Sequence, residues 1–588
     1  MRRLFILNPI LLRVLILALC LALVLTPEAS GGSGPVPVAP NGWRPAEPIE
    51  SASNCARNPS VSMDLSGNAY AAWEQADVGC PDVWMNPITY SVWANRYEPG
   101  VGWGLPERIE ILAGNSSQPR VEATPDGGAF VAWAQLDGDV GIWVSHYRIG
   151  VGWESPRALT ANNGTNPSIS VDSSGAAIVA WSEWNGSNYS LDASRFVPNT
   201  GWIPIDTLAT GPLEFAPFAG AGPARASTVF WTKFELGMPA SAVARRYVPG
   251  VGWGSVDDID MGGDATASGL AVDPTGNATA VWFEGALWVR RFVLSGGWTP
   301  AARLSSRFVT SVDTAAGGDG SGVAAWDVID GSRREVFASI YLPASGWSVE
   351  TRLDSPNLSN AWKARAAMDA RGNAIIVWQQ SDGGLDSILA NRYTANMGWG
   401  EAEFVETYSM GSADLPSVSS DPTGNAVAVW QQSDGTVTSI LASRYTPPDS
   451  TPPVVMIVSP SDGFRTTQSI VSIVGTTEPA VGLVVNGIRV GVAANGTFAV
   501  DVPLRPGTNM IVAVATDLAG NEGRASLTVE FVDTLAEEQA VLRLQVIVGF
   551  AALSLVLAAL EALRYLNSRR KKAGTESTLK DTGKNRLV

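Results

Sequence analysis

The sequence predicts an all-β chain with three parts: an eight-bladed β-propeller, a small β-sandwich after it, and one transmembrane helix near the C-terminus. Three observations lead to this prediction. A Gly-Trp pair follows a tyrosine or phenylalanine at one fixed distance along the chain. A turn signature that ends in an apolar run and a tryptophan recurs with it. The 60 glycines and 37 prolines, with short apolar runs between them, favour strands and turns over helices.

The first repeated element is the aromatic residue that precedes Gly-Trp. The separation from the aromatic residue to the tryptophan is six residues in seven pairs: Tyr97/Trp103, Tyr147/Trp153, Phe196/Trp202, Tyr247/Trp253, Phe292/Trp298, Tyr341/Trp347 and Tyr393/Trp399. Self-similarity at a period of about 50 residues is typical of propellers and solenoids.

The second element reads Asp-x-x-Gly-Asn-Ala-x-x-x-Trp. Its cleanest copies are Asp64–Trp73, Asp273–Trp282, Asp369–Trp378 and Asp421–Trp430, and weaker copies end at Trp133, Trp181, Trp231 and Trp326. An aspartate ahead of Gly-Asn can bond the backbone that follows it, and glycine accepts a positive φ. We therefore interpret the aspartate as a turn residue; a ligand role is the alternative. The alternating run after it predicts a buried strand.

Each repeat thus predicts four strands, which is the content of a propeller blade. There are eight second-strand tryptophans, and the eighth third-strand aromatic is Tyr445. The Gly-Trp pairs are displaced, because Gly42-Trp43 precedes the first blade and none follows Tyr445. We expect the N-terminal strand to complete the last blade and close the ring. An open solenoid is the alternative, but it does not explain the displaced strand.

Length variation concentrates on one side of the predicted ring. The second-strand tryptophan precedes the third-strand aromatic by 24, 14, 15, 16, 10, 15, 15 and 15 residues in the eight blades. This loop and the loop that joins successive blades emerge on the same side, which we name the variable face. The longest such loop, residues 74–87, holds Cys80, and Cys55 precedes the same blade. A Cys55–Cys80 disulfide follows, since Cys20 lies in the N-terminal apolar segment.

Candidate ligand-binding residues are aromatic side chains on the variable face that the repeat does not explain: Trp84, Trp184, Tyr189 and Trp362. Exposed aromatics can stack on sugars or anchor a protein partner; packing against the scaffold is the alternative. Possible N-glycosylation sites are Asn115, Asn163, Asn185, Asn188, Asn277, Asn357 and Asn495. All except Asn277 and Asn495 map to the variable face, where glycans would shield it. Such short asparagine runs are also common in turns.

Catalytic and metal-binding signals are weak. The only histidine, His146, holds a repeat position that is arginine in six other blades. A Ser-His-Asp triad or a His/Cys metal site is therefore not predicted, whereas a carboxylate-pair glycosidase remains compatible with the composition. The net charge of −16 disfavours a nucleic-acid partner. The turn is similar to the Asp-box of sialidase propellers, but it lacks the serine-led spacing, so we interpret the likeness as shared turn chemistry.

Two apolar segments predict the location. Residues 1–30 have Arg2 and Arg3, an apolar core and small residues after it, the pattern of a signal peptide; an uncleaved anchor is the alternative. Residues 541–566 predict a transmembrane helix, with a buried core helix as the alternative. The basic run at 569–572 predicts that the tail, 567–588, is cytoplasmic. The intervening parts are a linker at 31–40, the propeller at 41–449 and the sandwich at 450–534.

The sandwich region has strand-like runs at 454–458, 470–474, 481–485, 489–492, 497–502 and 510–515, with hairpin signals at Asn486-Gly487 and Asn495-Gly496. With Pro460 early and Gly507-Thr508-Asn509 leading to Asp517-Leu518-Ala519-Gly520-Asn521, it resembles bacterial Ig-like modules of the cadherin and glucodextranase B type, which are spacers in surface proteins and glycan-acting enzymes. Its position between the predicted propeller and the predicted transmembrane helix suggests a stalk. Asp517 is interpreted as a turn cap, with calcium binding as the alternative.

The predicted function is non-catalytic binding or adhesion, to a glycan or a protein, through the variable face of a membrane-anchored protein. One alternative is an extracellular glycan-active enzyme of glycosidase or lyase type. Another is a structural component of the cell envelope. Two close carboxylates in a pocket on the variable face would favour the enzyme. Exposed tryptophans without such a pair would favour a lectin-like binder.

Overall fold

The protein, seen in a computed structural model, divides into two compact units: residues 39–447, and residues 448–588 together with 1–38. The structure describes residues 42–578 except 51–53, 81–88, 112–113, 138, 161, 214, 407–410, 449–450, 479–480, 494 and 518–520. The predicted signal peptide, the predicted linker and the end of the predicted tail lie outside the described residues.

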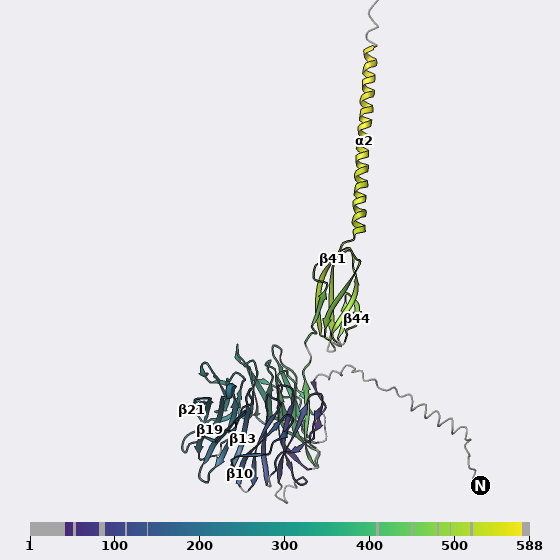
Figure 1. The fold of residues 1–588 in the computed structure, drawn as a ribbon. Helices are drawn as coiled ribbons and strands as arrows, with labels where there is room; N and C mark the ends of the chain where they lie inside the picture. Colours follow the sequence, from purple (N-terminus) through teal and green to yellow (C-terminus); the bar gives the residue numbers. More distant parts are fainter. Residues whose placement is uncertain are drawn as a thin grey trace, which may run out of the picture. The chain divides into compact units, whose positions relative to one another are not determined.

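The described part of the first unit contains eight antiparallel sheets that resemble propeller blades (Figure 1). The first strands are β3 (Ala56–Met63), β8 (Asn115–Ala123), β13 (Gly164–Val171), β18 (Phe218–Ala221), β22 (Thr266–Val272), β27 (Val309–Ala316), β32 (Ala361–Met368) and β37 (Ala413–Ser420). The second strands are β4 (Ala69–Ala76), β9 (Ala129–Asp137), β14 (Ala177–Trp184), β19 (Ser227–Lys233), β23 (Ala278–Phe283), β28 (Gly322–Asp330), β33 (Ala374–Ser381) and β38 (Ala426–Ser433).

The outer half of each blade is built from the aromatic strand and the Gly-Trp strand. The third strands are β5 (Tyr90–Glu98), β10 (Asp139–Arg148), β15 (Tyr189–Val197), β20 (Ser241–Val248), β24 (Leu287–Val293), β29 (Arg333–Leu342), β34 (Asp386–Thr394) and β39 (Thr438–Thr446). The fourth strand, mostly in two pieces on one partner, comprises β6 (Gly102–Trp103) and β7 (Glu107–Arg108), β11 (Gly152–Trp153) and β12 (Arg157–Thr160), β16 (Gly201–Trp202) and β17 (Asp206–Gly211), β21 (Gly252–Asp258), β25 (Gly297–Trp298) and β26 (Ala302–Ser305), β30 (Gly346–Trp347) and β31 (Thr351–Arg352), β35 (Gly398–Trp399) and β36 (Glu403–Phe404), and β1 (Gly42–Trp43) and β2 (Glu47–Pro48).

The N-terminal strand closes the ring. β1 pairs with β39 of blade 8, with Trp43 opposite Tyr445 and their ring centroids 5.4 Å apart. Each first strand contacts the first strand of the next blade, and β37 contacts β3. The predicted displaced strand is therefore confirmed. It leaves no outer edge of blade 8 unpaired at Tyr445.

The core lies between blades. Trp73 of blade 1 packs with Val427, Val429 and Ile440 of blade 8, which places a shared apolar layer across the closure. The eight second-strand tryptophans are all fully buried. Alternate second-strand residues face opposite neighbours, so these strands are buried on both sides and carry apolar residues at nearly every position.

The predicted turn chemistry is confirmed. Asp64 Oδ1 accepts hydrogen bonds from the backbone N–H groups of Ser66 and Asn68, at 2.8 and 2.9 Å, and Asp64 Oδ2 accepts from Asn68 Nδ2. Asp369 and Asp421 accept the equivalent bonds in blades 7 and 8. These aspartates are committed to the turn on the face opposite the variable face.

The repeated arginine before the third-strand aromatic joins neighbouring blades. Arg195 lies over the ring of Tyr247 in the next blade, 3.2 Å from its centroid, and Arg444 of blade 8 lies over Tyr97 of blade 1. His146 takes this place in blade 2 and meets Phe196 of blade 3 edge-on at 5.7 Å. Burial lowers the His146 pKa. Where the residue is arginine, it makes a cation–π contact between blades, which explains why arginine recurs; His146 makes a contact between rings instead.

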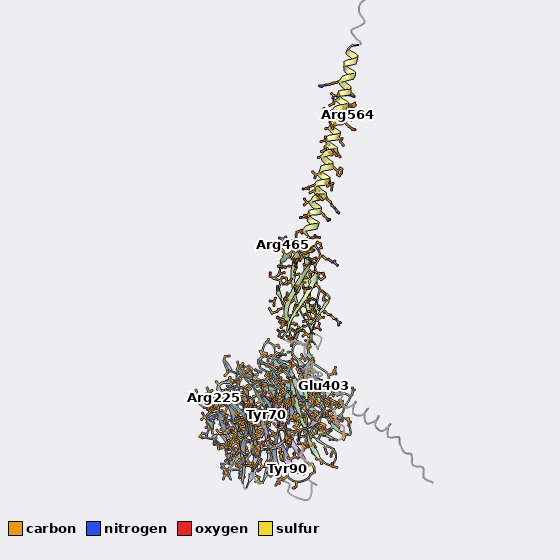
Figure 2. All side chains as sticks on the ribbon, turned by 45° about the vertical axis from the view of Figure 1, so that its right-hand side comes forward. Tyr70, Tyr90, Arg225, Glu403, Arg465 and Arg564 are labelled. Carbon is orange, nitrogen blue, oxygen red and sulfur yellow. A yellow bond between two sulfur atoms is a disulfide. The ribbon has the colours of Figure 1, made fainter. Side chains whose placement is uncertain are left out.

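Blade 1 adds a second tyrosine to this contact. Tyr70, labelled in Figure 2, is fully buried, and its hydroxyl accepts a hydrogen bond of 3.0 Å from Arg96 Nε. Burial raises the pKa of Tyr70 to about 12, although Arg96 opposes the shift. The phenol is therefore neutral at physiological pH and fixes the guanidinium beside Tyr147.

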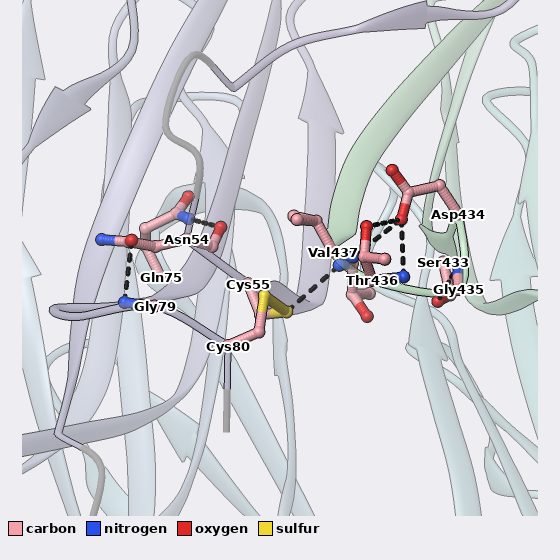
Figure 3. Close-up of a disulfide and its surroundings, with 11 residues drawn as sticks. Asn54, Cys55, Gln75, Gly79, Cys80, Ser433, Asp434, Gly435, Thr436 and Val437 are labelled. Atoms are coloured by element: carbon pink, nitrogen blue, oxygen red, sulfur yellow. Dashed lines mark hydrogen bonds between the residues drawn. A yellow bond between two sulfur atoms is a disulfide. The ribbon is translucent and has the colours of Figure 1, made fainter. Parts of the chain in front are cut away.

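The predicted disulfide between Cys55 and Cys80 is present (Figure 3). Cys55 N–H donates to the carbonyl of Gly79, and Cys55 Sγ accepts from the N–H of Thr438 in blade 8 at 3.1 Å. The bridge thus fastens the long loop of blade 1 beside the last blade.

Reduction of this bridge is expected to lower the free energy of unfolding by about 3 kcal/mol, because the oxidised unfolded chain is constrained by a loop with a sequence separation of 25. For a unit of this size the melting temperature should fall by roughly 3–4 °C. Thermal unfolding with and without dithiothreitol measures the effect. A Cys55→Ser/Cys80→Ser variant should melt at the lower temperature, and dithiothreitol should not change its melting temperature. If dithiothreitol lowered the melting temperature of both proteins equally, the stabilising role of the disulfide would be contradicted.

The second unit contains a two-sheet β-sandwich. One sheet has the order β40 (Val455–Ser459), β42 (Ile470–Thr477), β45 (Thr497–Pro503), and the other has β41 (Phe464–Thr466), β47 (Glu522–Phe531), β46 (Gly507–Thr516), β43 (Gly482–Val485), β44 (Ile488–Val490). Asn486-Gly487 makes the predicted hairpin between β43 and β44, with both φ values positive.

Two expectations for the sandwich need correction. Asn495-Gly496 lies in a turn closed by Ala493 and Thr497, but β44 and β45 belong to different sheets, so it is not a hairpin. The predicted strands also omitted β47, whose first half is too small and polar to stand out. Asp517 caps a turn, accepting from Asn521 N–H and Nδ2; calcium binding there stays a prediction.

The described C-terminal region forms one helix, α2 (Thr534–Thr578). Its stretch Glu538–Arg570 has a mean hydropathy of 2.4 over its best window and is long enough to cross a membrane. Its leucines and valines are exposed, as Leu555 is, so the described residues supply no core for it. The alternative of a buried core helix is not supported.

Candidate functional site

The first strands line the centre of the ring, and serine hydroxyls form hydrogen bonds between neighbouring first strands. Their inner edges have no further strand to pair with, so their N–H groups need other acceptors. Val61 and Met63 of blade 1 donate to the hydroxyls of Ser417 and Ser419 of blade 8, at 3.3 and 3.0 Å. Val121 and Ala123 donate in the same way to Ser60 and Ser62, and Ala219 and Ala221 to Ser168 and Ser170. Small hydroxyl residues therefore form much of the channel wall.

A cavity of about 890 Å³ opens where this channel meets the variable face. Its lining comes from the beginnings of first strands, which follow the inter-blade loops. The lining residues are Asn58, Pro59, Ser60, Gln118, Arg120, Phe218, Thr266, Ala267, Ser268, Phe283, Phe308, Val309, Thr310, Ser311, Val312, Asp313, Arg365, Leu415, Pro416 and Ser417. We name this cavity the channel mouth. It has the size of a ligand site.

The rim of the channel mouth has a fixed backbone. Among the described first strands, five carry a left-handed residue at one repeat position: Asn58, Gln118, Asn166, Lys363 and Leu415, with φ of 50–58°. Side chains of the preceding blade hold most of these residues. Glu74 Oε1 accepts from the N–H of Gln118 at 2.9 Å, and Gln431 Oε1 accepts from the N–H of Asn58. Backbone in this sparsely populated region persists where its surroundings hold it, and it is common at functional sites.

Three phenylalanines supply the apolar part of the channel mouth. Phe308 lies in the loop between blades 5 and 6 and is 60% exposed. Its ring meets that of Phe283 edge-on at 5.7 Å, and Phe218 lines the cavity from blade 4. An exposed ring beside hydroxyl and amide groups can contact the apolar face of a sugar while the polar groups bond its hydroxyls.

Charged groups stand in the same cavity. Asp313 Oδ2 accepts from the N–H of Ala366 at 2.9 Å, and Oδ1 accepts from the N–H of Thr314. Burial raises the pKa of Asp313, and Arg365 opposes the shift. Among the described lining residues Asp313 is the single carboxylate, while Arg120 and Arg365 are both cations.

Glu122 lies two residues further along β8, below Arg120 in the channel. It is partly accessible to the channel, is enclosed by protein, and accepts a hydrogen bond of 3.1 Å from Ser62 Oγ. Burial raises its pKa from 4.5 to about 7, and Ser62 partly offsets this. The carboxyl group is thus half protonated near neutral pH.

This raised pKa predicts a pH-dependent stability. Between about pH 4.5 and 7 the unfolded chain has lost the Glu122 proton while the folded chain keeps it, so the free energy of unfolding should fall as pH rises through this window. The expected total loss is about 1–3 kcal/mol, reduced by channel water. Denaturant unfolding at several pH values measures it. Glu122→Gln should match the wild type near pH 4.5 and exceed it above pH 7; parallel curves would contradict the prediction.

The structure separates the predicted binding aromatics from the channel mouth. Trp184 and Tyr189 face each other across β14 and β15 with centroids 4.8 Å apart, and both are half-buried. Trp362 is half-buried on β32, and none of these three lines the cavity. Trp84 lies outside the described residues. Their role in ligand binding stays a prediction, separate from the channel mouth.

The predicted sequons are mostly exposed. Asn163, Asn185, Asn188, Asn357 and Asn495 are exposed, whereas Asn115 and Asn277 are half-buried. Asn277 Nδ2 donates to Asp273 Oδ2 at 2.9 Å, so its amide serves the turn. Occupancy of the other sites stays a prediction.

Sequence reasoning did not find the channel mouth, although one signal for it was visible. Proline recurs five residues before the turn position at Pro59, Pro119, Pro167, Pro217 and Pro416. Proline inside a strand indicates an edge strand. Blades 6 and 7 have Val312 and Ala364 at the proline position, but the spacing to the turn still aligns their first strands with the others. The next position is then serine in three blades and charged at Arg120, Asp313 and Arg365.

Comparison with known proteins agrees with this architecture in part. Residues 453–533 match the family Glucodextranase, domain B, so the sandwich is a module of that type. No curated protein matches the chain.

Several solved structures are similar to the ring. The polysaccharide lyase PL25-Ulvanlyase bound to -[GlcA(1-4)Rha3S]- is 10% identical, with a TM-score of 0.41, covering 67% of this chain and 94% of that one. A Dyadobacter fermentans protein of unknown function is 13% identical, with a TM-score of 0.38, covering 68% and 98%. The Aleuria aurantia lectin is 10% identical, with a TM-score of 0.32, covering 62% and 99%. At these identities and TM-scores, the functions of these proteins are not inferred for this chain.

Proposed function

We propose that this protein is a membrane-anchored extracellular binding protein and that it holds a saccharide at the channel mouth, on the variable face of an eight-bladed propeller. The observation that carries the proposal is the composition of the cavity. Six hydroxyl side chains, two amides and three phenylalanines line a space of about 890 Å³. Such a lining offers hydrogen bonds to sugar hydroxyls and a ring surface to sugar C–H groups.

An extracellular location is supported by three features. The sequence predicts a signal peptide at 1–30, the Cys55–Cys80 disulfide fits an oxidising compartment, and α2 contains a stretch long and apolar enough to span a bilayer. With the tail at 567–588 in the cytoplasm, the ring and the glucodextranase B module would stand outside the cell.

Binding is favoured over catalysis by the carboxylate content of the channel mouth. Glycosidases generally need two carboxyl groups about the scissile bond, and Asp313 is the single described carboxylate in the lining. The rival reading, a glycan-active enzyme, draws support from Glu122, whose raised pKa suits a general acid. Release of reducing ends or unsaturated sugars from a polysaccharide by the wild type, but not by Glu122→Gln, would favour the enzyme.

A glycan array probed with the full chain in detergent tests the proposal. Phe308→Ala is expected to weaken binding of any glycan hit by 10-fold or more, because a sugar ring that stacks on an exposed aromatic side chain loses that contact. The matched control is Phe404→Ala, an exposed phenylalanine on β36 that does not line the cavity. Absence of glycan hits, or equal losses for both variants, would overturn the proposal.

A further inference from the structure

Two guanidinium groups meet in the channel mouth at the same repeat position. Arg120 on β8 and Arg365 on β32 each lie four residues before the turn position of their blade. Four other blades have Ser60, Ser168, Gly269 or Ser417 there, so long cations are departures from the pattern. Burial lowers the pKa of Arg120, and the charge of Arg365 lowers it further. The two cations therefore stand close enough to repel each other.

Neither guanidinium forms an ion pair with a described residue, although the charge of Asp313 attracts both groups and that of Glu74 attracts Arg120. Arg120 Nη1 donates to the carbonyl of Pro119 at 3.1 Å, and Arg365 Nη1 donates to the carbonyl of Ala364 at 2.9 Å. Among the described residues, neither has a carboxylate oxygen within 4.0 Å. Both residues line the cavity. Although the ring encloses both groups, Arg120 is exposed to the channel and Arg365 is half-buried, so both guanidinium groups are accessible to an anion that enters the cavity.

Asp313 lines the same cavity and offsets only one of the two positive charges. Both of its oxygens already accept backbone N–H bonds, from Thr314 and Ala366, which joins blades 6 and 7. Two cations and one committed carboxylate leave the lining with a net positive charge. The whole chain carries −16, so this positive site is a local exception on a protein that otherwise repels polyanions.

We propose that the saccharide bound at the channel mouth is acidic, and that Arg120 and Arg365 together clamp its carboxylate or sulfate group. Guanidinium forks match the geometry of both oxyanions and form charge-assisted bonds with them. Phe308, at the rim of the same cavity, would contact the sugar ring that carries the charge. This inference rests on the proposed function and adds the charge of the ligand to it.

The stability of the site gives a test that needs no ligand. Because the two cations repel each other and form no ion pair with a described residue, an Arg120→Gln/Arg365→Gln variant should melt at the same temperature as the wild type or higher. If the arginines were structural, the variant would melt lower, and the proposal would fall. The same measurement establishes that the variant is folded before binding is compared.

Binding is tested with polymers that differ in charge. The full chain in detergent is titrated with polygalacturonate, with fully methyl-esterified polygalacturonate, with dextran sulfate and with neutral dextran. The wild type is expected to bind polygalacturonate at least 10-fold more tightly than methyl-esterified polygalacturonate, or dextran sulfate at least 10-fold more tightly than neutral dextran. The carboxylate and sulfate arms identify which oxyanion is preferred. The double variant should lose that preference, whereas Arg303→Gln, an exposed arginine on β26, should keep it.

The outcomes separate this inference from the proposed function. Equal affinity of the wild type for charged and neutral polymers, with loss on Phe308→Ala, would overturn the acidic ligand and leave saccharide binding standing. Unchanged preference in the folded double variant would do the same. No binding to any of the four polymers would overturn the acidic ligand. Loss of the proposed function itself would require an empty glycan array as well.

Discussion

Deletion of residues 42–48 is expected to abolish the closed ring. These residues form β1 and β2, which cover the outer edge of β39. Without them Tyr445 loses Trp43, the backbone of Arg44 no longer donates to the carbonyl of Arg444, and the edge of blade 8 is left unpaired. Uncovered strand edges pair with other chains. The deleted protein should therefore unfold at a lower temperature by 10 °C or more, or associate, as measured by thermal unfolding and light scattering.

A point substitution gives the graded form of this prediction. Trp43→Ala should lower the free energy of unfolding by roughly 2–4 kcal/mol, since the side chain is half-buried against blade 8. The matched control is Trp298→Ala in blade 5. The ring centroids of Trp298 and Phe292 lie 5.5 Å apart, close to the 5.4 Å of the equivalent pair at the closure. Trp298 follows its partner strand through a short turn, whereas Trp43 is separated from Tyr445 by the whole ring. Trp43→Ala should cost more; equal losses would mean that closure adds nothing to this contact.

The scaffold was predictable from sequence because each of its contacts recurs. Trp430, the turn at Asp421 and the arginine at 444 all have counterparts in other blades, so period and spacing alone located strands, turns and the displaced Gly42-Trp43. The residue two positions after the buried tryptophan was missed. It is glutamine or glutamate in six blades and accepts the indole N–H, as Gln432 does for Trp430 at 2.9 Å. That signal was visible in the sequence and was left unused.

The candidate site was not predictable in the same way. Arg120, Asp313 and Arg365 matter because they differ from their repeat counterparts, and only the ring brings blades 2, 6 and 7 to one cavity. The exposure of Trp184 and Trp362 was equally hidden, because strand ends decide whether a loop tryptophan faces solvent or the sheet. Periodicity identifies what a fold shares among its repeats. A binding site depends on residues that depart from the repeat, and only the closed ring brings these residues close to one another.

The second large effect is expected at the buried tryptophan of blade 7. Trp378 packs between blades 6 and 7, against Ala338 and Ile340 on one side and Ile376 in its own strand. Its indole N–H donates to Gln380 Oε1 at 3.1 Å. Trp378→Ala should lower the free energy of unfolding by about 3–5 kcal/mol, because it opens a cavity between blades and removes one of the two hydrogen bonds to Gln380 Oε1, the other coming from the N–H of Ser355. Denaturant unfolding of the full chain in detergent measures the loss.

A comparison of two phenylalanine substitutions separates the hydrogen bond from the packing. Trp326 is as buried as Trp378, but its Nε1 has no partner among the described residues, since Val328 stands where Gln380 stands in blade 7. Trp378→Phe removes one hydrogen bond to Gln380 Oε1, which keeps its bond from the N–H of Ser355, whereas Trp326→Phe removes a buried donor that has no partner among the described residues. Trp378→Phe should therefore cost about 1–2 kcal/mol more than Trp326→Phe. Equal costs would mean that the glutamine does not stabilise the indole, and that its bonds to the carbonyls of Ser355 and Ser359 explain its recurrence instead.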